Sequence, residues 1–372
     1  MRNIVKRIVS VGVAAVIGVG MLVGCSSDGK SGSDSSGKDG NMKIGVCIWS
    51  TDDGLGADSK EALDFAADVL GVELVYRTGD YDAEGQITAV ENLVSAGCEG
   101  IMICPIVDTA VDDYLKICEN AGVYMQAFFR NIIDEETYEY CMSSDYFTGY
   151  VVEDEESAGA AMVDALAEAG CKKFGLINRE AGNGVIDRRQ EGVADRLKEL
   201  GLTYEVSTNS STATAADMTD ATDQLLAANP DIDALIVSSG SNGAIDAIVT
   251  DIEGTDIKLT SFDTPVDVPG AFKKGNLAML TTGSQIDPVY ALVNLYCTLT
   301  DQPKSDTPTE VKSNYIYMTS VEDAEFYSKY FSEFKTYTAE EIKALIAMDE
   351  ASFEKEVATY SLKMVQEKAG EN

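Results

Sequence analysis

From residue 42 onward, short apolar runs alternate with longer segments in which apolar residues recur every three or four positions. The short runs predict buried strands, and the longer segments predict amphipathic helices. Turns rich in Gly, Asn, Pro and Asp separate them. The predicted strands are 43–49, 72–76, 100–104, 123–129, 138–142, 173–177, 204–207, 234–237, 258–262 and 277–281.

Repeated strand–helix units favour parallel sheets that are covered by helices on both faces. The strands are too many for one sheet, and the pattern restarts near Cys141. We therefore expect an α/β fold with two doubly wound parallel-sheet lobes. In such sheets a ligand binds beyond the carboxyl ends of the strands, so the residues that follow each strand are the candidates for a binding site.

The first 41 residues have a different character. Three basic residues within the first seven precede an apolar stretch at residues 8–23, and a Leu-Val-Gly-Cys tetrad ends at Cys25. This order predicts a secretory signal at residues 1–25, and the tetrad resembles the bacterial lipobox, whose cysteine is lipidated. The alternative is an uncleaved membrane anchor with an incidental cysteine. Residues 26–41 contain no apolar side chain and predict a flexible tether.

Composition excludes several functions. A net charge of −35 repels nucleic acid. The absence of histidine removes Ser-His-Asp and Cys-His catalysis and most zinc sites. The chain has no C-x-x-C motif, and its seven cysteines other than Cys25 are expected to be buried small hydrophobic residues. We expect no catalysis, no cofactor and no metal, and a monomer.

Seven short motifs occur in a fixed order along the chain. They are Lys43-Ile-Gly-Val, Gly100-Ile-Met-Ile-Cys-Pro105, Ser144-Asp145 followed by Ser157-Ala158-Gly159, Arg189-Gln-Glu-Gly192, the stretch from Asn229 to Val237, Ser261-Phe-Asp263, and Thr281 to Gln285. With them the chain resembles, over residues 43–318, the ribose- and galactose-type substrate-binding proteins of ABC importers, which have the type I periplasmic-binding fold.

The resemblance implies two lobes joined by three crossings of the chain. These crossings are expected near Ser143–Asp145, Gly283–Gln285 and Val311–Asn314. The first lobe would then comprise residues 42–143 plus 285–311, and the second lobe residues 144–284 plus 312–334. Residues 335–372 are expected to form a charged helical extension outside the lobes. The ligand would lie in the cleft between the lobes, which close by hinge bending.

This resemblance also implies a function: an extracytoplasmic solute-binding protein, anchored to the cell membrane as a lipoprotein through Cys25. It would capture a small polar ligand, a sugar by family precedent, and deliver it to the permease subunits of an ABC importer. Two alternatives stay open. The chain could be the ligand-sensing subunit of a sensor kinase or chemoreceptor, or it could bind a nucleoside or another non-sugar ligand.

Four polar residues match binding positions of the family. Arg130 and Arg189 would donate to ligand oxygens, and Asp263 would accept from sugar hydroxyl groups. Gln285 lies at the second crossing and can both donate and accept. Three of them also have a structural alternative: a surface ion pair for Arg130, a helix cap for Asp263, and a hinge hydrogen bond for Gln285.

The first strand adds an aromatic candidate. Trp49 could stack on the C–H face of a sugar ring or belong to the core, and Asp52 and Asp53 follow it where the family often has polar ligand contacts. The chain departs from the family at two strand ends, where Cys104 and Phe129 replace an asparagine and an aspartate. A ligand other than free ribose is therefore expected.

Overall fold

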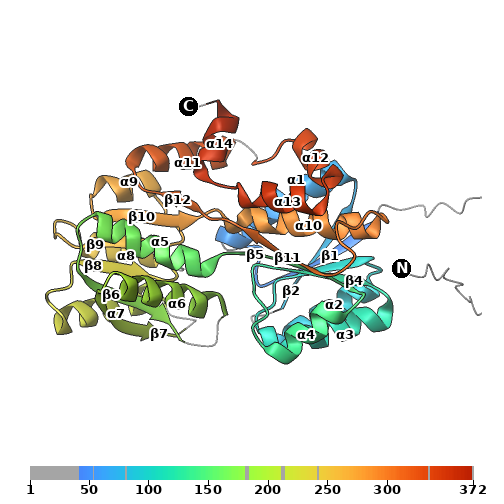
Figure 1. Cartoon of the computed structure of the whole chain (residues 1–372), viewed down its shortest axis with the longest axis horizontal. Coiled ribbons are helices and arrows are strands. Elements are labelled where there is room, and N and C mark those ends of the chain that lie inside the picture. Colours follow the sequence, from blue (N-terminus) through green and yellow to red (C-terminus); the bar gives the residue numbers. More distant parts are fainter. Residues whose placement is uncertain are drawn as a thin grey trace, which may run out of the picture. The chain divides into compact units, whose positions relative to one another are not determined.

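The computed structural model describes residues 42–52, 54–79, 82–180, 184–210, 214–240, 243–333 and 336–370 (Figure 1). The predicted signal peptide with Cys25, the tether and Asp53 lie outside the described residues. No helix in the described part of the chain is both long and apolar enough to cross a bilayer.

The first lobe is built on a six-stranded, fully parallel sheet in the order β11-β5-β4-β3-β1-β2. Helices α2 and α3 pack on one face of this sheet, and α1 and α10 pack on the other. Its strands are β1 (Lys43–Ile48), β2 (Glu73–Thr78), β3 (Gly100–Ile103), β4 (Tyr124–Phe128), β5 (Phe147–Glu153) and β11 (Thr309–Ser313). Its helices are α1 (Gly54–Leu70), α2 (Ala83–Ser95), η1 (Asp108–Ala110), α3 (Val111–Ala121), α4 (Glu135–Ser143) and α10 (Asp287–Leu299).

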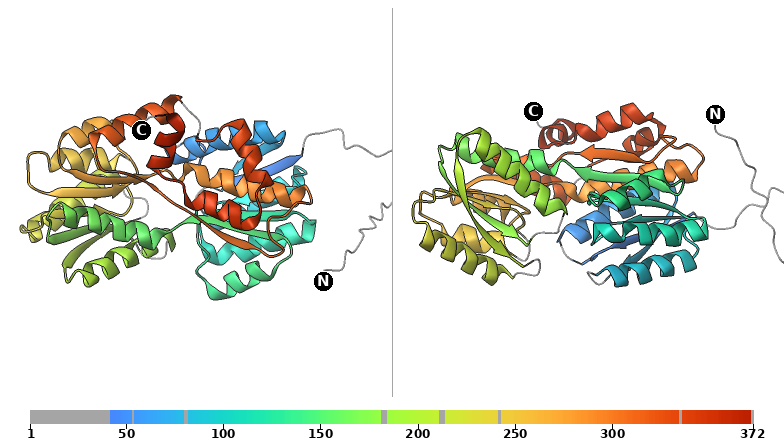
Figure 2. Two further views of the ribbon diagram at one scale, coloured as in Figure 1. Left: turned by 45° about the horizontal axis from the view of Figure 1, so that its top comes forward. Right: turned by 60° about the horizontal axis from the view of Figure 1, so that its bottom comes forward.

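The second lobe repeats this plan in a six-stranded sheet of order β12-β10-β9-β8-β6-β7, in which only β12 runs antiparallel to its neighbour (Figures 1 and 2). Its strands are β6 (Lys173–Arg179), β7 (Thr203–Asn209), β8 (Ala234–Val237), β9 (Lys258–Phe262), β10 (Leu277–Thr282) and β12 (Ile316–Met318). Its helices are α5 (Glu155–Glu168), α6 (Gly184–Glu199), α7 (Ala215–Ala228), α8 (Ala244–Asp251), α9 (Val268–Lys273) and α11 (Val321–Glu333). The predicted fold class, two doubly wound lobes, is confirmed.

One predicted strand is wrong. Residues 138–142 belong to helix α4, which Asp134 caps by accepting from the amide of Thr137 at 2.9 Å. The buried residues of this helix, Thr137 and Cys141, are four positions apart, which is helical spacing. The true strand is β5, whose seven residues are all buried and which pairs with β4 in the first sheet.

The first crossing therefore lies later than expected. The chain leaves the first sheet after Glu153 and starts α5 at Glu155, rather than crossing near Ser143–Asp145. It returns through the short 3₁₀ helix η2 (Ser284–Ile286) and crosses a third time between Ser313 and Ile316. Because β5 is buried on both faces, only a position inside the first sheet can cover it.

The C-terminal residues form three further helices. These are α12 (Ala339–Ala347), α13 (Glu350–Ala358) and α14 (Leu362–Ala369). Each carries buried apolar side chains despite its charged surface, and these join the core that surrounds α1 and α10. The cysteines after residue 42 are all buried and unpaired, as expected.

Two motif glycines allow α5 and α6 to pack closely. A Cβ at Gly159 would lie 2.2 Å from the carbonyl oxygen of Arg189, and a Cβ at Gly192 would lie 2.0 Å from that of Glu156. No methyl group fits at either distance. The close contact brings the first turn of α5 against the side chain of Arg189.

We predict that Gly192→Ala destabilises the protein by about 1–3 kcal/mol, because the two helices must separate to admit the methyl group. Gly54→Ala is the control, since a Cβ there meets nothing within 4 Å. Urea unfolding followed by circular dichroism measures both variants. Equal midpoints for Gly192→Ala and the unsubstituted protein would contradict this account of the helix contact.

Candidate functional site

The predicted site residues follow strands of both sheets at their carboxyl ends. Trp49 follows β1 and Arg130 follows β4 in the first lobe, while Asp263 follows β9 in the second. Gln285 lies in η2, which is itself the second crossing. Parallel strands end at one edge of a sheet, so each lobe gathers its candidates at one edge.

On the first lobe this edge is aromatic and basic. The rings of Trp49 and Phe129 are tilted by 51° with centroids 5.7 Å apart. Phe129 has a φ of 65°, which is unusual for a bulky residue. Arg130 is half-buried and has no hydrogen-bond or ion-pair partner among the described residues, so its five N–H donors are available. Asp52 is exposed in a bend.

On the second lobe the edge is polar. Asp263 also has a left-handed backbone, with a φ of 66°. Its Oδ2 accepts from the amide of Gly240 at 3.1 Å, which holds the carboxylate between two strand ends. Arg179, the last residue of β6, is buried and donates to Ser210 at 3.2 Å and Ser239 at 3.5 Å. Burial lowers the pKa of Arg179, and the charge of Asp263 opposes this shift.

Arg189 is committed to its own lobe. Its Nε donates to Glu155 at 2.6 Å, and Nη2 donates to Glu155 at 3.3 Å and to the hydroxyl of Tyr315 at 2.9 Å. Nη1 donates to the carbonyl of Ser238 at 2.9 Å, and the guanidinium carbon lies 3.5 Å from the centre of the Phe262 ring. Four of its five N–H groups are thereby used.

These contacts also affect the pKa of Arg189. Burial alone would lower the pKa of Arg189, but Glu155 and Tyr315 raise it above the ordinary value of an arginine. Of these two arginines, the sequence motifs point to Arg189 and do not select Arg179. The structure places Arg179, not Arg189, close enough to Asp263 for this carboxylate to be its main stabilising charge. The carboxyl-end rule could have found Arg179, because it is the last residue of its strand.

Two buried carboxyl groups lie where the chain crosses between the lobes. Glu153 ends β5 and is 3% exposed, and Asp287 begins α10 and is 0% exposed. Ser313, at the third crossing, donates to Asp287 Oδ1 at 2.5 Å. Among the described residues, no donor reaches Glu153 Oε1 or Asp287 Oδ2, and the two carboxyl groups are close enough for each to affect the pKa of the other.

Burial is the main cause of the raised pKa values of this pair. It raises the pKa of Glu153 well above its ordinary value, and Asp287 and Glu155 add to the shift. Burial likewise raises the pKa of Asp287 to about 7, although the hydrogen bond from Ser313 opposes it. The pair therefore holds at least one proton at neutral pH, since two adjacent buried carboxylates cannot both ionise.

Gln285 has a partner that sequence reasoning missed. It is 7% exposed and forms a hydrogen bond with Tyr327 of α11, whose hydroxyl also lies 3.2 Å from Thr282 Oγ1. Burial raises the pKa of Tyr327 to about 12, and these two hydrogen bonds oppose the rise. Tyr327 lies in a segment that carries no recognisable motif, so no local signal pointed to it.

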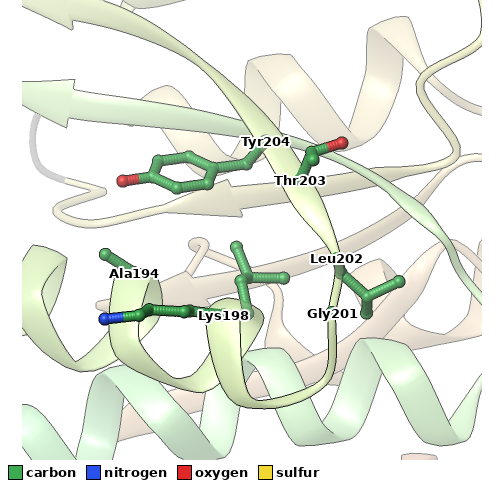
Figure 3. A pocket seen from close by; sticks show the side chains of 7 residues that line it. Ala194, Lys198, Gly201, Leu202, Thr203 and Tyr204 are labelled. Atoms are coloured by element: carbon green, nitrogen blue, oxygen red, sulfur yellow. The ribbon is translucent and has the colours of Figure 1, made fainter.

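A pocket of about 380 Å³ lies elsewhere on the second lobe, between the end of α6 and the start of β7 (Figure 3). Its lining is Ala194, Leu197, Lys198, Gly201, Leu202, Thr203 and Tyr204. These residues lie at the amino end of β7, whereas the candidate residues lie at the carboxyl ends of the strands. The pocket is therefore not part of the candidate site. The described residues contain no cluster of three acidic, cysteine or histidine side chains suited to a metal ion.

Comparison with known proteins gives a family match. The profile of the periplasmic binding protein domain matches residues 44–302. A xylitol-binding protein of Mycolicibacterium smegmatis is 21% identical over 189 residues, which are 50% of this chain and 49% of that protein. The chain thus spans about half the length of the curated relative it matches.

Solved structures share the fold. An ABC transporter solute-binding protein from Agrobacterium vitis, bound with α-D-tagatopyranose, has a TM-score of 0.65 at 18% identity, covering 75% of this chain and 95% of its own. One from Actinobacillus succinogenes with D-allose has a TM-score of 0.66 at 16% identity, covering 77% and 99%. One from Bacillus halodurans with myo-inositol has a TM-score of 0.64 at 19% identity, covering 79% and 100%.

The acid pair predicts a pH dependence of stability. Between about pH 4 and pH 7 the native protein holds a proton that the unfolded chain has released. The free energy of unfolding therefore falls as the pH rises. The fall is at most about 1.4 kcal/mol per pH unit for each such proton. Asp287→Asn removes one of the two titrating groups and its repulsion of Glu153, so it should reduce the fall and give the more stable protein at pH 8. Thermal unfolding between pH 4 and pH 8 measures the effect.

The control for this experiment is Asp251→Asn, which changes an exposed carboxylate at the end of α8. The control should follow the unsubstituted protein at each pH. If Asp287→Asn follows it too, the two carboxyl groups do not share a proton.

Proposed function

Because the chain belongs to the periplasmic binding protein domain family, we propose that it is an extracytoplasmic solute-binding protein. It captures a sugar or related polyol and delivers it to the permease subunits of an ABC importer. The observation that carries the proposal is that the strand ends of the two lobes present different chemical groups, each suited to a different part of a sugar. Arg130, which has no partner within the described residues, and an aromatic pair lie on one lobe, and a carboxylate held by a backbone amide lies on the other.

Each group has a separate part in binding. Arg130 donates to ligand oxygens, and Asp263 accepts from hydroxyl groups with the oxygen lone pairs that Gly240 leaves unused. The Trp49 ring covers a C–H face of the ligand. Gln285, held by Tyr327, adds a donor and an acceptor from the crossing itself. Asp52 and Asp53 remain proposed rim contacts of the first lobe.

Arg189 acts mainly by positioning. Its four hydrogen bonds join α5, the end of β8 and the third crossing. The remaining Nη1 N–H is its one donor for a ligand oxygen. The loops that carry the ligand contacts of the second lobe are thereby fixed before the ligand arrives, which lowers the entropy cost of binding.

The mechanism is binding without covalent chemistry. Groups from both lobes hydrogen-bond one ligand, and bending at the three crossings closes the lobes over it. Lipidation of Cys25 would hold the protein at the outer face of the cell membrane, with residues 26–41 as a tether. The relatives support a neutral polyhydroxy ligand, since their names and bound molecules are xylitol, tagatose, allose and inositol.

A thermal-shift screen tests the function. The full chain is melted with xylitol, D-tagatose, D-allose, D-arabinose and myo-inositol, and with nucleosides and amino acids for comparison. A ligand at one hundred times its Kd stabilises the native state by about 2.7 kcal/mol, so a true ligand raises the Tm by several degrees. A rise with only a nucleoside or an amino acid would overturn the sugar assignment, and turnover of a bound sugar would overturn binding without chemistry.

Substitution of Asp263 tests the site. Asp263→Asn keeps an oxygen for Gly240 and tolerates the left-handed backbone, but it removes the charge. We expect binding of the sugar found in the screen to weaken by about 1.5–3 kcal/mol, the range for hydrogen bonds to a charged group. Calorimetric titration measures the affinity. The control is Glu205→Gln, an exposed carboxylate on β7 of the same lobe, and equal affinities in the two variants would remove Asp263 from the site.

A further inference from the structure

The last three helices contact both lobes. Residues 336–370, which we call the C-terminal strap, place α12 against α1 and α10 of the first lobe and α13 against β11. The strap then continues to α14, which packs on α11 and β12 of the second lobe. Figure 1 shows the strap in red along one side of the molecule, from α12 over one lobe to α14 beside α11.

On the first lobe the strap is anchored by buried contacts. The hydroxyls of Tyr290 and Tyr337 are 2.8 Å apart and both side chains are buried. Lys304 donates to the carbonyls of Leu345 at 2.7 Å and Met348 at 2.9 Å, which closes the C-terminal end of α12. A positive charge at the C-terminal end of a helix also interacts favourably with the helix dipole.

On the second lobe the anchor is the apolar face of α14. Leu362 and Val365 are buried there, whereas Lys363 on the same helix is exposed. Lys368 returns to the first-lobe part of the strap, with its Nζ 3.0 Å from Glu341 and 3.9 Å from the centre of the Tyr337 ring. The strap therefore links its own two ends as well as the two lobes.

The middle of the strap lies against the crossings. Asn314, at the third crossing, donates to the carbonyl of Ala358. Tyr360 is 0% exposed, and its hydroxyl has no hydrogen-bond partner in the described part of the chain. Burial raises the pKa of Tyr360, and so do the nearby charges of Tyr327 and Asp287. This part of the strap therefore contacts the third crossing directly, through Asn314 and Ala358.

The strap lies outside the shared domain, since the family match ends at residue 302. Three crossings alone leave two lobes free to bend about them. A packed segment with one end on each lobe adds a fourth connection. Any bending that separates the lobes must then shear α14 from α11, or α12 and α13 from the first lobe.

We propose that the C-terminal strap is a brace that restrains bending at the crossings and limits how far the two lobes separate. It does not touch the ligand, and its role does not depend on which sugar the site takes. The brace acts by adding buried apolar contact that bending has to break. Without it, the crossings open more often while the sheets stay folded.

Hydrogen exchange of the full chain without ligand tests the brace. Val365→Ala weakens the second-lobe anchor, and Lys363→Ala changes an exposed residue of the same helix. We expect amides of residues 284–287 and 313–318 to exchange about fivefold faster in Val365→Ala and unchanged in Lys363→Ala. Amides of β3 and β8 report global unfolding, and they should change less than those of the crossings.

Equal acceleration at the crossings and in β3 and β8 would mean that α14 only adds stability, and it would overturn the brace. A chain that ends at Tyr360 gives a second test by small-angle scattering, where the unliganded protein should show a larger radius of gyration. If that chain melts as one transition with an unchanged radius, the proposal also fails. If it does not fold, the exchange experiment alone decides.

Discussion

Negative charge buried at the crossings constrains the rest of this molecule. Glu153, Glu155 and Asp287 are all buried near one another, and among the described residues Arg189 is the one cation ion-paired with any of them, through Glu155. Three carboxylates and one guanidinium cannot all stay charged there, because isolated buried charges cost several kcal/mol each. The carboxyl groups are divided between two arrangements: Glu155 pairs with Arg189, while burial raises the pKa of Glu153 and Asp287 so that these two keep a proton between them. The first crossing supplies Glu153 and Glu155 and the second supplies Asp287, while Ser313 and Tyr315 of the third crossing hydrogen-bond to Asp287 and Glu155, so the charge balance and the lobe connections share the same residues.

Arg189 and Arg130, the two arginines of the predicted site, differ in whether they are available to bind a ligand. Arg189 is ion-paired with Glu155, and its guanidinium group lies over the ring of Phe262. Arg130 is left without a partner among the described residues and can hydrogen-bond a ligand without first breaking an ion pair. Backbone strain is concentrated beside the binding groups, since Phe129 and Asp263 both have a left-handed conformation. Such conformations cost about 1–3 kcal/mol each and persist where the surrounding structure imposes them.

The sequence predicted the fold well because its signals are local. Strand and helix patterns depend on the spacing of apolar residues, and the carboxyl-end rule then placed Trp49, Arg130 and Asp263 correctly relative to their strands. It failed at residues 138–142, where aromatic residues suggested a strand but Asp134 starts a helix. Neither the proton shared by Glu153 and Asp287 nor the contact of Tyr327 with Gln285 could be predicted, because each joins residues far apart in the chain. The prediction for residues 335–372 missed their packing for a related reason. The many charged residues in this segment obscure its buried apolar positions, such as Leu345, Phe353 and Val365.

The strap and the acid pair are physically coupled. Burial raises the pKa of Asp287, and burial likewise raises the pKa of Tyr290 and Tyr360, with a smaller contribution from the nearby Asp287. Tyr360 belongs to the strap, and Tyr290 is hydrogen bonded to it through Tyr337. The strap thus forms part of the cover that keeps the crossings dry. Bending that lifts this cover would hydrate Asp287 and release its proton, because hydration favours the charged carboxylate. Retention of the proton and the proposed restraint of the hinge would then depend on the same packed tyrosines, of which Tyr290 lies within the matched domain and Tyr337 and Tyr360 follow it.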